Sequence, residues 1–169
     1  IAELILETAV RRAEAAAWRI DTLPLDPDVW DVVNRNRPIE HQAACVKLRY
    51  ETKGRGHGQD HGDKIGPEGD ILLPMPMALK LHDYRQKVRP MALTIALRKA
   101  KNVREAEILR HNTVHLFLNP ASGERYTGQK IYDFWTNKRA HCPRGWSPHL
   151  ARDFWACSTL WKHLEEQKA

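Results

Sequence analysis

The sequence lacks the features that mark disulfide-bonded or membrane-spanning chains. It holds only three cysteines, Cys45, Cys142 and Cys157, and they are far apart without CxxC spacing. That pattern argues against a disulfide scaffold or a cysteine zinc site and favours a reducing compartment. No apolar run approaches the roughly 20 residues of a membrane span, and the first residues do not have the layout of a signal peptide. The expected location is therefore the cytoplasm, with no membrane partner.

Internal repeats and low-complexity tracts are also absent. The 169 residues are 42% hydrophobic and 28% charged, a globular composition at a length that predicts a single domain. The charge is uneven. Residues 1–79 hold 10 Lys and Arg against 13 Asp and Glu, a net of −3, whereas residues 80–169 hold 17 against 8, a net of +9. A basic half favours a polyanionic partner, of which nucleic acid is the usual one, and a solvated basic surface remains the alternative.

Hydrophobic periodicity predicts a mostly α chain with a small β-hairpin, an α+β fold. Residues 1–20 have helical spacing, 21–33 fit either a helix or a short strand, and 43–73 are predicted as a hairpin with a long glycine-rich tip. A helix is expected from Met77, with a break at Pro90 and a second helix over 91–110. Two later helices are expected to begin after Thr127 and Ser147, which suit the N-cap position.

The last of these helices opens with "SPHLARDFW", residues 147–155. His149 and Arg152 are three residues apart, so they share one face close to the helix N-terminus, where free N–H groups and the helix dipole favour an anion. A guanidinium adds bidentate recognition of oxygens, and an imidazole adds a proton donor or acceptor near neutral pH. The pair has the chemistry of a phosphate site, although such a pair on a helix is more often solvated surface.

Four segments in order carry a resemblance to one family. They are "TAVRRAEAAAWR" (8–19), "RYETKGRG…GDILLPMP" (49–76), "HLFLNPASGERYTGQKIYDFW" (115–135) and "SPHLARDFWA" (147–156). Each is similar to a motif of the tyrosine recombinases, the phage-integrase family, and together they span nearly the whole chain. The resemblance implies a tyrosine-recombinase catalytic-domain fold over residues 1–169. It also implies that this chain lacks the N-terminal core-binding domain and the C-terminal segment that carries the nucleophile.

The resemblance also implies the catalytic residues. Arg11 and Arg152 would hold the non-bridging oxygens of a DNA phosphate, Lys53 would protonate the leaving 5′-oxygen, and His149 would act in acid–base chemistry. Glu14 would orient Arg11. The family cuts and rejoins DNA through a 3′-phosphotyrosyl intermediate, with no metal and no cofactor. All four tyrosines of this chain precede His149, so no nucleophile is expected in it, and the chain alone is expected to be inactive in cleavage.

The implied partners are double-stranded DNA at a recombination site and further copies that form a tetramer on that DNA in a full-length parent. The parent would be encoded by a phage or mobile element or be associated with the bacterial nucleoid. Three positions depart from the family pattern: Ala9 replaces a glycine, Arg12 is an additional arginine, and Asp153 stands where histidine is common. Two alternatives stay open, a type IB topoisomerase-like enzyme and a non-catalytic DNA-binding relative. A tyrosine a few dozen residues beyond Arg152 in a longer sequence would exclude the second.

Three other segments could suggest a functional site, but each is interpreted as part of the fold or the surface. The segment "HGQDH" (57–61) lies in the glycine-rich tip and is predicted to be solvated rather than a metal site. Trp135, Trp155 and Trp161 sit among apolar residues at helical spacing and are predicted to lie in the core. The basic run over 98–104 is interpreted as solvated helix surface, with a contact to the DNA backbone as the alternative.

Overall fold

The computed structural model describes residues 1–33, 44–50, 69–138, 145 and 147–168 of the chain. Its helices are α1 (Ala2–Thr8), α2 (Arg12–Ala17), α3 (Met75–Leu97), α4 (Val103–Asn112), α5 (Gly128–Lys138) and α6 (Pro148–Glu166), with a short 3-10 turn at Pro27–Val29. Its strands are β1 (Val32–Val33), β2 (Cys45–Tyr50) and β3 (Gly69–Pro74). The prediction of a mostly helical chain with a small sheet, an α+β fold, is confirmed.

The three strands form one antiparallel sheet in the order β1-β2-β3. In the predicted hairpin, which is confirmed, Val46 of β2 lies opposite Leu73 of β3. Both side chains are fully buried, as is most of Leu48, because alternate residues of a strand point to the same face. Residues 21–33, for which a helix and a strand were both open, contain the 3-10 turn and then β1. The predicted hairpin tip, with Lys53 and residues 57–61, lies outside the described residues.

The first twenty residues do not form the single helical element that their composition predicts. α1 ends at Thr8 and α2 begins at Arg12, and Ala9 between them adopts the left-handed conformation, with φ 56° and ψ 16°. The Ala9 N–H donates to Ile5 O at 3.0 Å, which closes the end of α1. The break turns the chain so that both short helices bury apolar side chains, and this long-range burial outweighs the local preference for one helix.

Replacing Ala9 by glycine is expected to raise the free energy of unfolding by about 0.5–1 kcal/mol. The left-handed conformation costs a residue with a Cβ roughly 1–2 kcal/mol, and the greater freedom of glycine in the unfolded chain offsets part of that gain. Urea denaturation measures the change. Ala13→Gly, inside α2, is the matched control and should lose about 1 kcal/mol. Equal losses for the two variants would contradict the left-handed turn.

The predicted helix break at Pro90 is wrong, because α3 runs through Pro90 without interruption. Two buried arginines, both in the turns of α3 that precede Pro90, fix this part of the helix on the rest of the chain. Arg85 donates to the carbonyl oxygens of Ile20, Leu23, Pro24 and Leu25. Arg89 donates to the carbonyl oxygens of His115 and Thr113. Burial lowers the pKa of both guanidinium groups, yet these tertiary hydrogen bonds hold the helix in one piece.

The second helix predicted over 91–110 is not one continuous helix: residues 91–97 belong to α3 and residues 103–110 to α4, so the break lies between them. α3 ends at Leu97, and α4 begins only after Asn102. The Asn102 side chain accepts from the N–H of Glu105 at 2.8 Å, and Glu105 accepts in return from the N–H of Lys101 at 2.7 Å. This reciprocal cap was present in the sequence as a polar residue followed three positions later by glutamate.

The N-caps predicted for the two last helices are confirmed. The hydroxyl of Thr127 accepts from the N–H of Lys130 at 3.1 Å, and that of Ser147 accepts from the N–H of Leu150 at 3.4 Å. Pro148 occupies the first position of α6, where its missing N–H removes no helical hydrogen bond.

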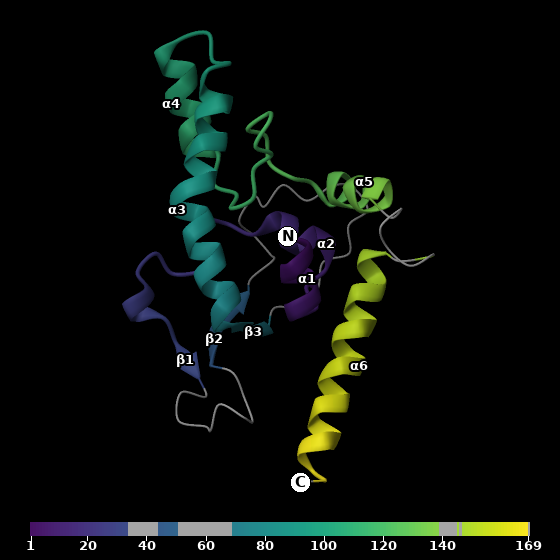
Figure 1. Ribbon diagram of the computed structural model, residues 1–169. Helices are drawn as coiled ribbons and strands as arrows, with labels where there is room; N and C mark the ends of the chain where they lie inside the picture. The colour runs from purple at the N-terminus through teal and green to yellow at the C-terminus, as the bar shows by residue number, and fades with distance from the viewer. Residues whose placement is uncertain (34–43, 51–68, 139–144, 146, 169) are drawn as a thin grey trace.

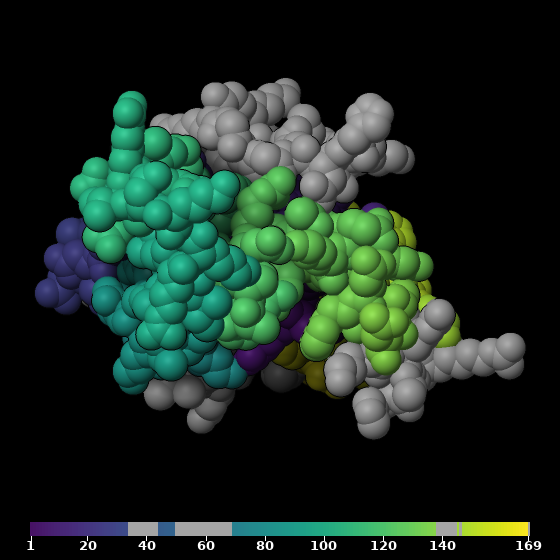
Figure 2. All heavy atoms as spheres, turned by 90° about the horizontal axis from the view of Figure 1, so that it is seen from above, coloured from purple at the N-terminus to yellow at the C-terminus, as the bar shows by residue number. Residues whose placement is uncertain are grey.

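One buried cluster joins most of these elements. It combines side chains of α1, α2, β2, β3, α3, α5 and α6 with Leu116 and Phe117, and Trp18 is its largest fully buried member. Figure 1 shows the long α3 on one side of this core and α6 on the other. From above, the green segment around residues 113–127 lies between α3 and α5 (Figure 2). Among the described residues, no helix is both long enough and apolar enough to cross a bilayer.

Candidate functional site

The turn between α1 and α2 presents Arg11 at the N-cap of α2. The backbone N–H of Arg11 donates to Glu14 Oε2 at 2.6 Å, and its Nη1 donates to Glu14 Oε1 at 2.8 Å. Glu14 therefore satisfies an orphan donor at the helix start and holds the guanidinium at the same time. This two-point contact is the geometry expected if Glu14 orients Arg11.

The Arg11 side chain stays accessible despite this pair. It is 37% exposed, whereas the Glu14 side chain is 12% exposed. A guanidinium has five N–H donors, so one carboxylate leaves donors for a second acceptor. Arg11 is thus a cation fixed by a carboxylate and still open to an anion.

α6 presents His149 and Arg152 in its first two turns. Pro148 and Ala151 are buried and His149 is exposed. The exposure of Arg152 is intermediate between them. The Nε atom of Arg152 is buried and finds no hydrogen-bond partner among the residues that the structure describes. A buried donor of a charged group costs free energy when it is left unpaired, and a bound anion would offset that cost.

α6, which carries His149 and Arg152, lies beside α1, the helix that precedes Arg11. α1 packs against α6, and Trp155 Nε1 donates to Glu7 O at 3.0 Å across 148 positions of sequence. Glu7 precedes Arg11 by four residues, and Trp155 follows Arg152 by three, about 4.5 Å along the helix axis. Figure 1 shows α6 starting beside α1 and α2. The structure thus brings the segment leading into Arg11 next to the start of α6, and it pairs Arg11 with Glu14.

Trp155 is a residue whose role the sequence did not predict. It was expected in the core, and it is half-buried with its indole N–H fixed on α1. No local pattern could identify that bond, because its acceptor is a backbone carbonyl 148 residues away. Lys53, the remaining predicted site residue, lies outside the described residues.

The additional arginine of the turn has a different environment. Arg12 Cζ lies 4.9 Å from the ring centroid of Tyr132 on α5, a cation–π contact. Arg12 therefore links α2 to α5, while Arg11, its neighbour, pairs with Glu14. The two arginines form a matched pair for experiments that need one altered cation at the site and one beside it.

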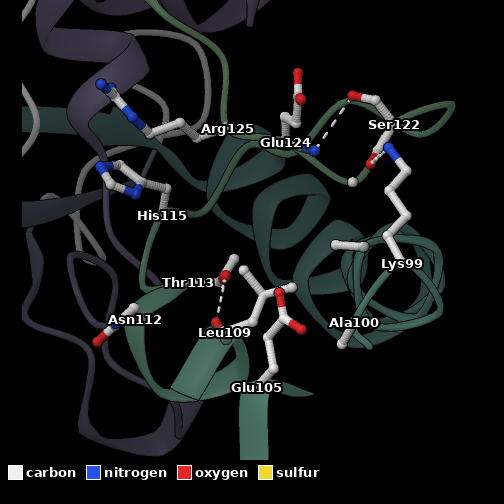
Figure 3. A pocket seen from close by; sticks show the side chains of 12 residues that line it. Lys99, Ala100, Glu105, Leu109, Asn112, Thr113, His115, Ser122, Glu124 and Arg125 are labelled. Atoms are coloured by element: carbon white, nitrogen blue, oxygen red, sulfur yellow. Dashed lines mark hydrogen bonds between the residues drawn. The ribbon is translucent and has the colours of Figure 1, made fainter. Parts of the chain in front are cut away.

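A separate cavity of about 550 Å³ lies between α3, α4 and the 113–125 segment (Figure 3). Its polar groups serve local structure. Lys99 Nζ donates to Ser122 O at 2.8 Å, and the Thr113 hydroxyl donates to Leu109 O at 2.6 Å. Gly123, with φ 73°, closes on α3, where a Cβ would come within 2.5 Å of Ala92 O. Gly123 is one of the residues that line the cavity, and none of the predicted site residues does.

Among the residues that the structure describes, no group of three or more His, Cys, Asp or Glu side chains is arranged so that it could bind a metal ion. The histidines of the 57–61 segment fall outside those ranges. In comparisons with known proteins, no family model matches the chain, and no curated protein and no solved structure matches it either.

Proposed function

We propose that the chain is the catalytic domain of a tyrosine recombinase, an enzyme that cuts and rejoins DNA through a 3′-phosphotyrosyl intermediate. The observation that carries the proposal is Arg152, a cation with an unpaired buried Nε among the described residues, on the helix packed beside the segment that leads to Arg11. In this proposal both guanidinium groups bind one phosphodiester, whose oxygens fit the fork of donors on each arginine. The order of the four family-like segments supports the same reading.

The chemistry assigns a role to each group. In the cleavage step, a tyrosine oxygen attacks phosphorus, the bond from phosphorus to the 5′-oxygen breaks, and charge grows on the non-bridging oxygens. Arg11 and Arg152 stabilise that charge by fixed hydrogen bonds. Lys53 gives a proton to the 5′-oxygen, and His149 acts as acid–base partner or holds the phosphate. Glu14 keeps Arg11 in place. The bond energy stays in the phosphotyrosyl link, so no nucleotide and no metal is needed.

The rejoining half of this reaction tests the proposal without a tyrosine. The substrate is a pool of nicked duplexes in which one strand ends in a 3′-p-nitrophenyl phosphodiester and the next begins with a free 5′-hydroxyl. This aryl ester replaces the phosphotyrosyl bond. Attack by the 5′-oxygen breaks the bond between phosphorus and the aryl oxygen, releases p-nitrophenolate and joins the strands. The proposal predicts both products above the uncatalysed rate, in stoichiometric amounts. Their absence across the pool would contradict it.

The partner in this proposal is double-stranded DNA, met in the cytoplasm by the product of a bacterial or mobile genetic element. The chain carries a net charge of +6, and residues 80–169 account for +9. Binding to random duplex DNA should therefore be weak and carried by phosphate contacts. Its affinity should fall at least about tenfold between 50 and 200 mM salt, because each neutralised phosphate releases condensed counterions. Fluorescence anisotropy over a salt series measures the slope, and a flat response would contradict phosphate binding.

A further inference from the structure

α6 carries two apolar faces, and the core uses only one of them. Pro148 and Ala151 are buried against the rest of the chain, and Trp155 is anchored on α1. A second row of exposed side chains follows the helix on another face. It consists of Leu150, Phe154, Cys157, Trp161 and Leu164, which we call the α6 seam. Trp161, predicted to lie in the core, is 63% exposed, and that prediction is wrong.

The α6 seam has the spacing of a coiled coil. Its members follow one another at intervals of four, three, four and three residues, which is the 3.5-residue repeat of a and d positions. Single exposed apolar residues are ordinary on protein surfaces. A row of five along one helix, in which Phe154 is 55% and Trp161 63% exposed, is a pattern typical of a helix face that another helix covers. Figure 1 shows α6 running away from α1 toward its C-terminal end.

We propose that the α6 seam is covered by α6 of a second copy of this chain, in an antiparallel two-helix contact. An antiparallel pair sets each a position against a d position. In that arrangement Trp161 faces Leu150 of the other copy, and Phe154 faces Cys157. Every layer then combines a large side chain with a smaller one, which fills space without strain.

The flanks of the α6 seam suit self-association. Next to its four facing layers lie Ala151, which the core already covers, and Ser158 on one side, and Asp153 and Leu160 on the other. Asp153 is the one charged residue among these four, and it faces Leu160 of the second copy, so no like charges meet. Antiparallel helices also place opposite dipole ends together. The contact repeats itself about a two-fold axis, as in most soluble dimers.

The expected dimer is weak. Phe154 and Trp161 are already partly buried, so of the 150–250 Å² that such side chains bury in full only about 80–160 Å² each is left to cover. With its other members the α6 seam offers at most about 500 Å² per copy, or roughly 1,000 Å² in total, the lower limit for a specific interface, so a weak and concentration-dependent dimer is expected. Because α6 is already helical in the folded chain, association carries no conformational-entropy cost for forming this helix.

Sedimentation velocity of the chain over a concentration series tests the proposal. The wild-type chain should pass from monomer to dimer, and Trp161→Glu should weaken the dimer by at least about thirtyfold, because the largest side chain of the α6 seam is replaced by a charged one. Ile108→Glu is the matched control, because Ile108 lies 53% exposed on α4, away from the α6 seam. It should dimerise like the wild type. Circular dichroism of both variants shows that the fold is retained.

Orientation is tested by disulfide trapping in a Cys157→Ser background. A mixture of Asp153→Cys and Leu160→Cys chains should form a mixed disulfide, because these positions meet only when the helices are antiparallel. Peptide mass spectrometry identifies the bond. A chain that stays monomeric at several hundred micromolar would overturn the proposal and leave a helix of another protein as the occupant. A dimer that Trp161→Glu leaves intact, or that never gives the mixed disulfide, would also overturn it.

Discussion

Replacing Arg152 by glutamine should lower the rate of p-nitrophenolate release from the aryl-ester DNA by about a hundred- to a thousandfold. That is the loss expected when one fixed donor to a developing oxyanion is removed. Arg11→Gln should cause a loss of the same order, although Glu14 would then lose its ion-pair partner.

Three comparisons make this prediction specific. Arg152→Lys should recover part of the rate, because it keeps the charge but not the fork of two parallel donors. Arg12→Gln should stay within a few-fold of the wild type, because Arg12 contacts the ring of Tyr132 instead. Stopped-flow absorbance at saturating DNA separates the rate from binding. A loss below tenfold for Arg152→Gln, or equal losses for Arg12 and Arg152, would contradict the assigned roles.

Arg85→Ala is expected to lower the free energy of unfolding by about 3–5 kcal/mol, the largest stability effect that we predict. Arg85 is 7% exposed and donates to four carbonyl oxygens of the 20–25 segment and to the ring of His82. Its removal leaves those carbonyls without a donor and opens a void under α3. Arg104→Ala, on the exposed face of α4, should change stability by less than about 0.5 kcal/mol. Urea denaturation compares them, and equal effects would contradict the buried network.

Much of the fold followed from local signals, whereas its exceptions did not. The caps at Thr127 and Ser147 and the alternation in β2 and β3 depend on neighbouring residues, and their elements were predicted. The helix break predicted at Pro90 was wrong because the sequence shows that proline lacks an N–H group. It does not show the distant carbonyl oxygens that accept hydrogen bonds from Arg85 and Arg89. The break at Ala9 has the same origin, since burial on both sides of the turn decides it.

The candidate site likewise contains one contact that local sequence predicts and one that it does not. Arg11 and Glu14 are three residues apart, so their pairing belongs to one helix start and could be foreseen. The approach of α6 to α1 could not, because Trp155 and Glu7 are separated by 148 positions. Trp161 failed as a core prediction for a related reason. Helical spacing identifies an apolar face, but it cannot state whether this chain or another one covers it.

The claim that Arg11 and Arg152 hold one phosphate is tested most directly by NMR of the arginine Nε–H groups in the folded chain. A titration with a short duplex ending in a 3′-phosphate, or with inorganic phosphate, reports each guanidinium separately. We expect the Arg11 and Arg152 signals to move together, with one midpoint, while the Arg12 signal stays in place. Movement of one signal without the other, different midpoints, or an equal response from Arg12 would contradict a shared phosphate site.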